Sequence, residues 1–143
     1  MKKITCIIIL LASLGFHSQT KAQVVGTLGK YSGYSEPYSI GVVAGKDIIV
    51  PGIQHSFNFL AKNSVSLVQV SDKGDKAQYK GTSTTTLKKD GSKMIVCKML
   101  EVTTSAYPSK PEYHILFSVN GSIKCQENPG SKVKTSPFEL KKD

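Results

Sequence analysis

Apolar and polar residues alternate along this chain in short runs of the kind that form β-strands. Most runs are rich in β-branched and aromatic residues, and Asn, Asp, Gly and Pro interrupt them at close spacing. After residue 22, no stretch of about ten residues or more has the period of an amphipathic helix. The expected strands span residues 38–44, 47–50, 56–61, 64–71, 76–87, 93–103, 112–119, 122–126 and 132–140.

This succession of short strands predicts one all-β domain over residues 38–143. Strands joined by short turns pair antiparallel, so we expect an antiparallel β-sandwich of about seven to nine strands, with a small β-barrel as the alternative. Residues 104–111 form a longer connector, where the chain would pass between two sheets. Residues 23–37 precede the first expected strand and are interpreted as a flexible N-terminal lead.

Two glycine-containing dipeptides predict tight turns. Asn120-Gly121 and Asp90-Gly91 favour the two positive φ angles of a type I′ turn, so each should close a two-residue hairpin. With Asn120-Gly121 at the tip, Leu116 faces Cys125 across the hairpin. Because facing residues share one side of a sheet, we expect Leu116, Cys125 and the neighbouring Ile123 to be buried together.

The first 22 residues have the order of a secretory signal peptide. Lys2 and Lys3 are followed by an apolar run over residues 6–16 and then by a polar stretch that ends at Ala22. A membrane-spanning helix needs about 20 apolar residues, so this run is too short to be one. We expect cleavage after Ala22 and a secreted or periplasmic product without a transmembrane segment.

The charge of the chain changes when this segment is set aside. The formal net charge of the whole chain is +9, and residues 1–22 contain three lysines and no acids, so the remainder has a charge of +6. Every basic residue is a lysine. Arginine is the usual residue for reading guanine edges and clamping phosphates, and the lysines here are scattered. The composition therefore predicts no nucleic-acid partner.

The cysteines are interpreted through the expected export. Cys6 lies in the signal segment, which leaves Cys97 and Cys125 in the exported chain. An even pair of cysteines in an oxidising compartment predicts a disulfide. The rival interpretation is a thiol nucleophile partnered by His114, but neither cysteine lies in a recognisable catalytic motif.

Residues that could carry catalysis are sparse. His55 and His114 are the histidines after residue 22, and neither has a second histidine or cysteine at metal-ligand spacing. The chain contains no Gly-x-Ser-x-Gly motif, and residues 41–46 do not have the spacing of a phosphate-binding loop. Both histidines are interpreted as strand residues. The sequence thus predicts no enzyme, no cofactor and no metal.

A tyrosine-rich segment is the candidate contact region. Tyr31, Tyr34 and Tyr38 lie among serine and glycine, and Tyr107 opens a second candidate loop over residues 107–111. Tyrosine offers a wide contact area at a low entropy cost, while serine and glycine adapt to the partner. The simpler alternative is that residues 31–38 only lead into the first strand, and that residues 107–111 are only a rigid connector.

Together these features predict a small exported binding protein without catalytic activity. Its partner would be another protein, such as a toxin or hydrolase that it neutralises or a cell-envelope component, recognised through loops or a sheet edge. The alternative is a secreted carbohydrate-binding domain or hydrolase that uses residues 31–38 and His55. A structural envelope or adhesion subunit is a third hypothesis, which would need exposed edge strands that can pair.

Overall fold

The structure is a computed structural model that describes residues 27–103, 107–132 and 135–143. All strand pairs in these residues are antiparallel, and none of the described residues is helical. The prediction of an all-β antiparallel fold is confirmed. The expected signal segment, residues 1–22, lies outside the described residues.

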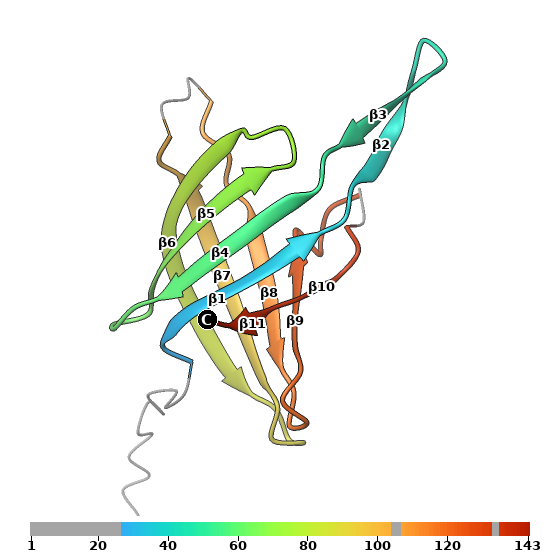
Figure 1. Ribbon diagram of the computed structural model, residues 1–143. Coiled ribbons are helices and arrows are strands. Elements are labelled where there is room, and N and C mark those ends of the chain that lie inside the picture. The colour runs from blue at the N-terminus through green and yellow to red at the C-terminus, as the bar shows by residue number, and fades with distance from the viewer. Residues whose placement is uncertain (1–26, 104–106, 133–134) are drawn as a thin grey trace, which may run out of the picture.

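A large sheet of nine strands makes up most of the molecule (Figure 1). β1 (Gly29–Ser35) lies beside β4, and from β4 to β9 each strand pairs with the next one along the chain. Six consecutive strands form this up-and-down meander: β4 (Ile53–Phe59), β5 (Ser64–Ser71), β6 (Lys76–Leu87), β7 (Lys93–Glu101), β8 (Glu112–Phe117) and β9 (Ile123–Glu127).

The C-terminal segment nearly closes this sheet into a barrel. β10 (Phe138–Glu139) pairs with β9, and β11 (Lys141–Lys142) pairs with β1, so one short segment bridges the first and last strands of the sheet. At this closure a Cβ on Gly33 would lie 2.2 Å from the backbone oxygen of Glu139. A glycine is therefore needed where β1 approaches the C-terminal segment. The arrangement corresponds to the small-barrel alternative.

The expected flexible lead is wrong over residues 29–35, because they form β1. Tyr31 points into the barrel, where 1 % of its surface is exposed, and its ring meets those of Phe59 and Phe117 edge to face. The alternation of inward apolar and outward polar residues is hard to see in this segment of the sequence, because the next inward position after Tyr31 is Gly33, which has no side chain. Packing of Tyr31 thus decides the structure of a segment that is otherwise rich in serine and glycine.

A separate two-stranded sheet projects from the barrel between β1 and β4 (Figure 1). It consists of β2 (Tyr38–Val43) and β3 (Lys46–Val50), joined by Ala44 and Gly45. Both turn residues have positive φ angles, 50° and 75°, as a type I′ turn requires. This sheet is called the projecting hairpin below.

The two hairpins predicted at Asn120-Gly121 and Asp90-Gly91 have longer turns than expected. Of each pair only the glycine has a positive φ, and the closing bonds run from the Ser118 N–H to the Ser122 carbonyl and from the Lys88 N–H to the Ser92 carbonyl. These are three-residue loops in which the last residue is a left-handed glycine. The predicted type I′ turns are therefore wrong.

A side-chain contact explains the longer turns. The Asn120 Oδ1 accepts hydrogen bonds from the backbone N–H and the hydroxyl of Ser122, at 3.0 and 2.9 Å, and Asp90 and Ser92 repeat the arrangement. Such bonds to the residue two positions ahead favour a negative φ at Asn or Asp. The extra residue shifts the register by one, so that Ile115 rather than Leu116 faces Cys125. Leu116 therefore lies on the outer side, contrary to expectation.

The predicted disulfide is also wrong. Cys97 in β7 and Cys125 in β9 are fully buried free cysteines. β8 lies between their strands, so their backbones are about 9–10 Å apart, whereas a disulfide joins Cα atoms about 4.4–6.8 Å apart. Burial raises the pKa of the Cys97 thiol to about 12, which disfavours the thiolate that a nucleophile needs.

The barrel has two different ends. Tight turns at residues 60–63, 88–92 and 118–122 form the end called the closed end, and apolar side chains such as Phe59 and Ile95 fill the interior behind them. The projecting hairpin, the turn at residues 72–75 and the described residues of the two longer connectors, 102–103, 107–111, 128–132 and 135–137, form the open end. Buried polar side chains, His55 and Gln69 among them, lie in the interior behind the open end.

Candidate functional site

A chain of polar contacts crosses the interior of the barrel behind the open end. The Ser35 Oγ lies 3.0 Å from the His55 Nε2, and the His55 Nδ1 lies 3.2 Å from the Gln69 Nε2. The Gln69 amide also donates to the Tyr113 hydroxyl at 2.9 Å, and Tyr113 hydrogen-bonds to Glu127. These five residues, called the polar chain below, come from five different strands of the sheet.

The amide of Gln69 sets the direction of these bonds. An amide nitrogen only donates hydrogen bonds, so the Tyr113 hydroxyl accepts from Gln69, and its own proton is left for Glu127. Because the Gln69 amide also donates to Nδ1 of His55, the proton of the neutral imidazole lies on Nε2. His55 consequently donates its hydrogen bond to Ser35.

This arrangement does not prepare His55 to act as a base. A base that activates Ser35 would need an unprotonated Nε2, and here that nitrogen is the donor. Burial lowers the pKa of His55 to about 4, so the imidazolium that would form is also disfavoured. The ring stacks on Phe138, with centroids 4.5 Å apart. His55 therefore holds β4 against the C-terminal segment from inside the barrel.

The hollows at the open end are small. One cavity of about 40 Å³, lined by Ser35, Tyr38 and Glu127 among others, has room for only a few water molecules. A more open hollow of about 190 Å³ lies over Gln69 and Ala77, and its lining includes no aromatic side chain. The first cavity has aromatic and polar lining but is too small for a sugar ring, and the second lacks an aromatic platform on which a sugar could stack.

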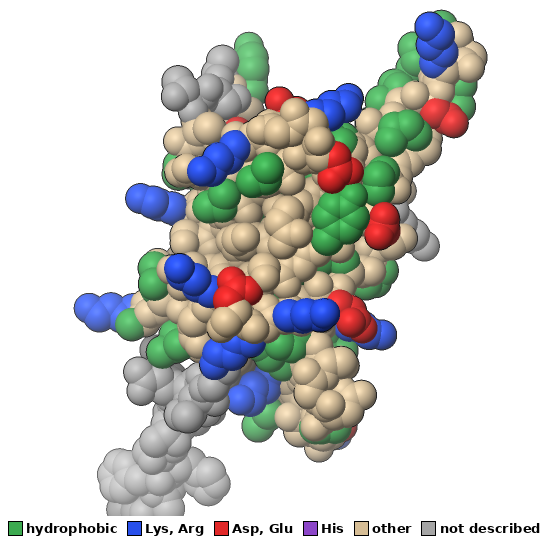
Figure 2. Space-filling view, in the orientation of Figure 1, with side chains coloured by type: hydrophobic (Ala, Val, Ile, Leu, Met, Phe, Trp, Pro, Cys, Tyr) green, Lys and Arg blue, Asp and Glu red, His purple; other side chains and the backbone are tan. Residues whose placement is uncertain are grey.

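The projecting hairpin exposes apolar side chains along its length. Figure 2 shows these side chains on the arm that extends from the barrel. A two-stranded hairpin in water is marginally stable by itself, and contiguous exposed apolar surface is typical of an interaction site. Its exposed apolar residues are Ile40, Val42, Val43, Ile48 and Ile49, with exposed fractions between 42 % and 64 %.

The base of the hairpin is braced against the barrel. The Tyr34 hydroxyl donates to the Asp72 carboxylate at 2.8 Å, and the Asp72 N–H donates to the Gly52 carbonyl at 2.9 Å. A Cβ on Gly52 would lie 1.9 Å from the Tyr34 hydroxyl, so a glycine is needed at this position. Tyr38 and Val50 pair at the base and are half-buried. The hairpin thus leaves the barrel from a fixed point.

The four tyrosines proposed for binding lie in different surroundings. Tyr31 is in the core, so it cannot contact a partner of the folded protein, which corrects that assignment. Tyr34 braces the hairpin, and Tyr38 stands at its base beside the small cavity. Tyr107 lies in the connector between β7 and β8, with 92 % of its surface exposed. Tyr34 and Tyr38 thus lie at the base of the projecting hairpin.

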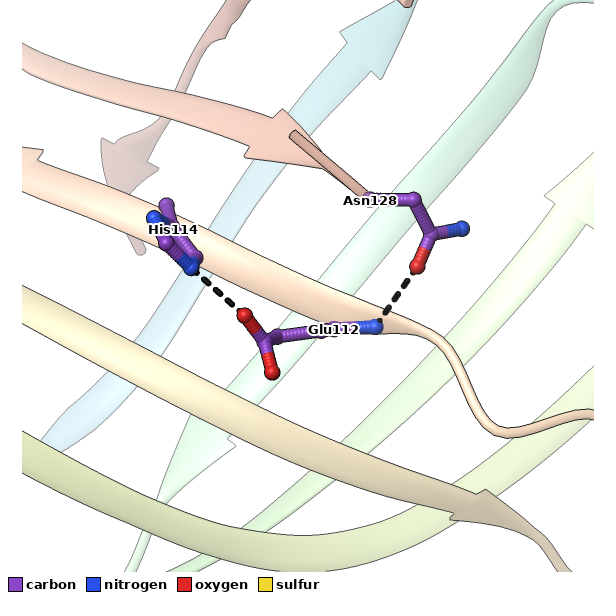
Figure 3. A network of polar contacts seen from close by, with 3 residues as sticks. All are labelled: Glu112, His114 and Asn128. Carbon is purple, nitrogen blue, oxygen red and sulfur yellow. Dashed lines mark hydrogen bonds and ion pairs between the residues drawn. The ribbon is translucent and has the colours of Figure 1, made fainter. Parts of the chain in front are cut away.

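His114 lies on the outer face of β8 and contacts a carboxylate (Figure 3). Its Nε2 is 2.7 Å from the Glu112 Oε1, and the Glu112 N–H donates to the Asn128 side chain at 2.8 Å. Cys97 and Cys125 point to the opposite side of the sheet. His114 therefore does not form the thiol–imidazole pair that the rival interpretation of the cysteines requires.

The hairpin is the feature that sequence reasoning missed. Both of its strands were expected, at residues 38–44 and 47–50, but not their projection away from the rest of the fold. Ile48, Ile49 and Val50 are apolar at consecutive positions, a pattern that normally indicates a strand buried on both faces. The strand is exposed here, so the signal in the sequence is the apolar run itself, which is also typical of a strand that a partner covers.

Within residues 27–103, 107–132 and 135–143, no group of three His, Cys, Asp or Glu side chains is placed to hold a metal ion. The same residues include no helix with the length and apolarity that a membrane span requires. Compared with protein-family models, curated proteins and solved structures, the chain gives no match.

Proposed function

We propose that this chain is a small exported binding protein without catalytic activity, and that the projecting hairpin holds a protein partner. The observation that carries the proposal is the exposure of Val42, Val43 and Ile49 on a braced arm. A protein partner would remove these side chains from water. The proposal of export rests on the pattern of residues 1–22, and a toxin, a hydrolase or a cell-envelope component is the expected kind of partner.

Two modes of contact are available to the hairpin. Facing residues share a side, so Val43 and Ile48 lie on one face, where an apolar groove of the partner could cover them. The outer edges of β2 and β3 have no strand partner in the described part of the chain, so a strand of the partner could also extend the two-stranded sheet. Either mode uses the hairpin rather than the barrel wall.

The test is affinity capture from the envelope and secreted fractions of the native organism. The wild-type protein is compared with a Val43→Ser/Ile48→Ser variant and with a Val70→Ser/Leu100→Ser variant. The last two residues are exposed on the outer barrel wall and serve as a matched control. We expect the wild type and the wall variant to capture the same protein, and the hairpin variant to lose it. Equal capture by all three would contradict the proposal.

The alternative function is hydrolysis, because one contact favours it. Ser35 and His55 are within hydrogen-bond distance, as a nucleophile and its base must be. The proton on Nε2 and the lowered pKa of His55 argue against this function. A purified His55→Gln variant decides between the two. A hydrolase would lose turnover of ester or glycoside substrates with this change, whereas we expect no turnover from either protein.

A further inference from the structure

The closed end of the barrel exposes two apolar side chains at neighbouring turns. Leu87 ends β6 and is 66 % exposed, and Val119 lies in the turn between β8 and β9 and is 73 % exposed. The two turns are in contact, since a Cβ on Gly91 would lie 3.3 Å from the Cγ1 of Val119. Neither apolar side chain contributes to the buried core.

Three lysines lie beside Leu87. Lys88 and Lys89 follow Leu87 in the turn, and Lys93 opens β7 directly opposite Leu87. Asp90 lies in the same turn, where its carboxylate accepts two hydrogen bonds from Ser92. We call the surface formed by Leu87, Lys88, Lys89, Lys93 and Val119 the turn-pair patch.

The same combination recurs on the other side of this end. The pairing of Gly29 with Phe59 brings Leu28 beside Leu60, and both leucines are about half exposed. Lys30 and Lys62 lie next to them in the sequence and are exposed. Figure 2 shows lysine side chains around this lower part of the barrel. Apolar tips and lysines therefore occur together on both sides of the closed end.

We propose that the closed end docks on an anionic lipid surface, with the turn-pair patch as its point of insertion. Lysines near such a surface are attracted to the headgroup phosphates, and apolar side chains between them enter the boundary of the acyl chains. A soluble polyanion would engage the lysines alone and leave Leu87 and Val119 in water. The combination of the two kinds of side chain thus favours lipid.

This docking is independent of the proposed hairpin function. The hairpin leaves the barrel at the start of β4, and the closed end begins where β4 ends, so the two surfaces lie at opposite ends (Figure 1). A protein docked through its closed end would present the hairpin away from the lipid. A negative result for lipid binding therefore leaves the proposed hairpin function untouched, and the reverse also holds.

The test is sedimentation with lipid vesicles, using the chain from residue 23 onward, the expected product of export, which contains every described strand. Vesicles of phosphatidylglycerol and phosphatidylcholine in equal parts are compared with pure phosphatidylcholine. We expect at least tenfold stronger partition into the anionic vesicles. Leu87→Ser/Val119→Ser and Lys88→Glu/Lys89→Glu should each reduce this partition about tenfold or more.

Matched control variants distinguish docking through the closed end from a general effect of surface charge or hydrophobicity. Val70→Ser/Leu100→Ser and Lys73→Glu/Lys76→Glu change exposed residues away from the closed end and should leave the partition within about twofold of wild type. On soluble dextran sulfate, the Lys88/Lys89 variant should bind more weakly and the Leu87/Val119 variant should bind as wild type does. Equal partition of wild type and the Leu87/Val119 variant into anionic vesicles would overturn the proposal, as would equal wild-type partition into both kinds of vesicle. Unchanged circular dichroism establishes that each variant is folded.

Discussion

Ile95 in the barrel wall and Ile49 in the projecting hairpin are the same residue in the same secondary structure, yet 1 % and 51 % of their surfaces are exposed. In the barrel, the curvature of a nearly closed sheet turns every second side chain toward a shared interior. The hairpin has two strands and no opposing layer, so its apolar side chains face water on both sides. The difference shows that strand propensity and apolar composition do not by themselves decide what a strand buries.

The largest expected effect comes from making one substitution in both regions. Ile95→Ala should lower the free energy of unfolding by about 2–5 kcal/mol, because it leaves a cavity among packed side chains. Ile49→Ala should change it by less than about 0.5 kcal/mol, as is usual for an exposed site. Urea unfolding of both variants measures the two effects. Comparable losses of stability in the two variants would mean that Ile49 is packed against other side chains in the free protein.

The buried histidine should make barrel stability depend on pH. The pKa of His55 is lowered from an ordinary value of 6.5 to about 4, so folding favours the neutral ring. The stabilisation is present above pH 6.5 and is lost as the pH falls toward 4, by about 3 kcal/mol in total. Burial raises the pKa of Glu127, whose contribution has the opposite sign and is lost as the pH rises.

Urea unfolding between pH 4 and pH 7 tests this dependence. We expect His55→Gln to flatten the loss of stability on acidification, and Glu127→Gln to steepen it by removing the opposing contribution. His114→Gln is the matched control, because this histidine lies on the outer face. An unchanged pH profile in the His55 variant would show that the buried ring does not couple folding to protonation.

The closure of the barrel should depend on a single glycine. Gly33→Ala places a methyl group against the backbone of Glu139 and should cost about 1–3 kcal/mol of stability. Gly130→Ala is the control, since a Cβ at that position has no neighbour within 4 Å. Thermal unfolding of both variants measures the difference. Equal melting temperatures would indicate that β1 and the C-terminal segment do not meet as described.

The smallest expected effect is that of a reducing agent. Because Cys97 and Cys125 are free and buried, dithiothreitol should leave the free energy of unfolding of the chain from residue 23 onward unchanged. Thiol titration should find two thiols per chain after denaturation and almost none before. A loss of stability on reduction would instead support a disulfide between the two cysteines.

Several strands could be predicted because local alternation determines them. The expected bounds 64–71 and 76–87 coincide with β5 and β6, where Val65, Leu67 and Tyr79 occupy inward positions among polar neighbours. β1 could not be predicted in this way, because its inward position at Gly33 is filled by the backbone of a segment about a hundred residues away in the sequence. Closure of the barrel is a long-range contact with no local signal.

The candidate site was harder to predict than the fold. His55, Gln69 and Glu127 occupy inward strand positions, but polar residues in a strand are normally interpreted as solvent-facing. Their burial becomes intelligible only when the hydrogen bonds among them are known. The type of the turns at Asp90 and Asn120 was predicted wrongly for a related reason. In each turn the side chain of the residue before the glycine accepts a hydrogen bond from a serine two positions ahead.

Hydrogen exchange tests most directly whether the projecting hairpin is a docking element. Amides of β2 and β3 should exchange rapidly in the free protein, while those of β5 to β8 are protected. When the captured partner is added, we expect protection to appear in the hairpin and to leave the barrel wall unchanged. Slow exchange of the hairpin in the free protein, or new protection confined to the barrel, would contradict the proposal.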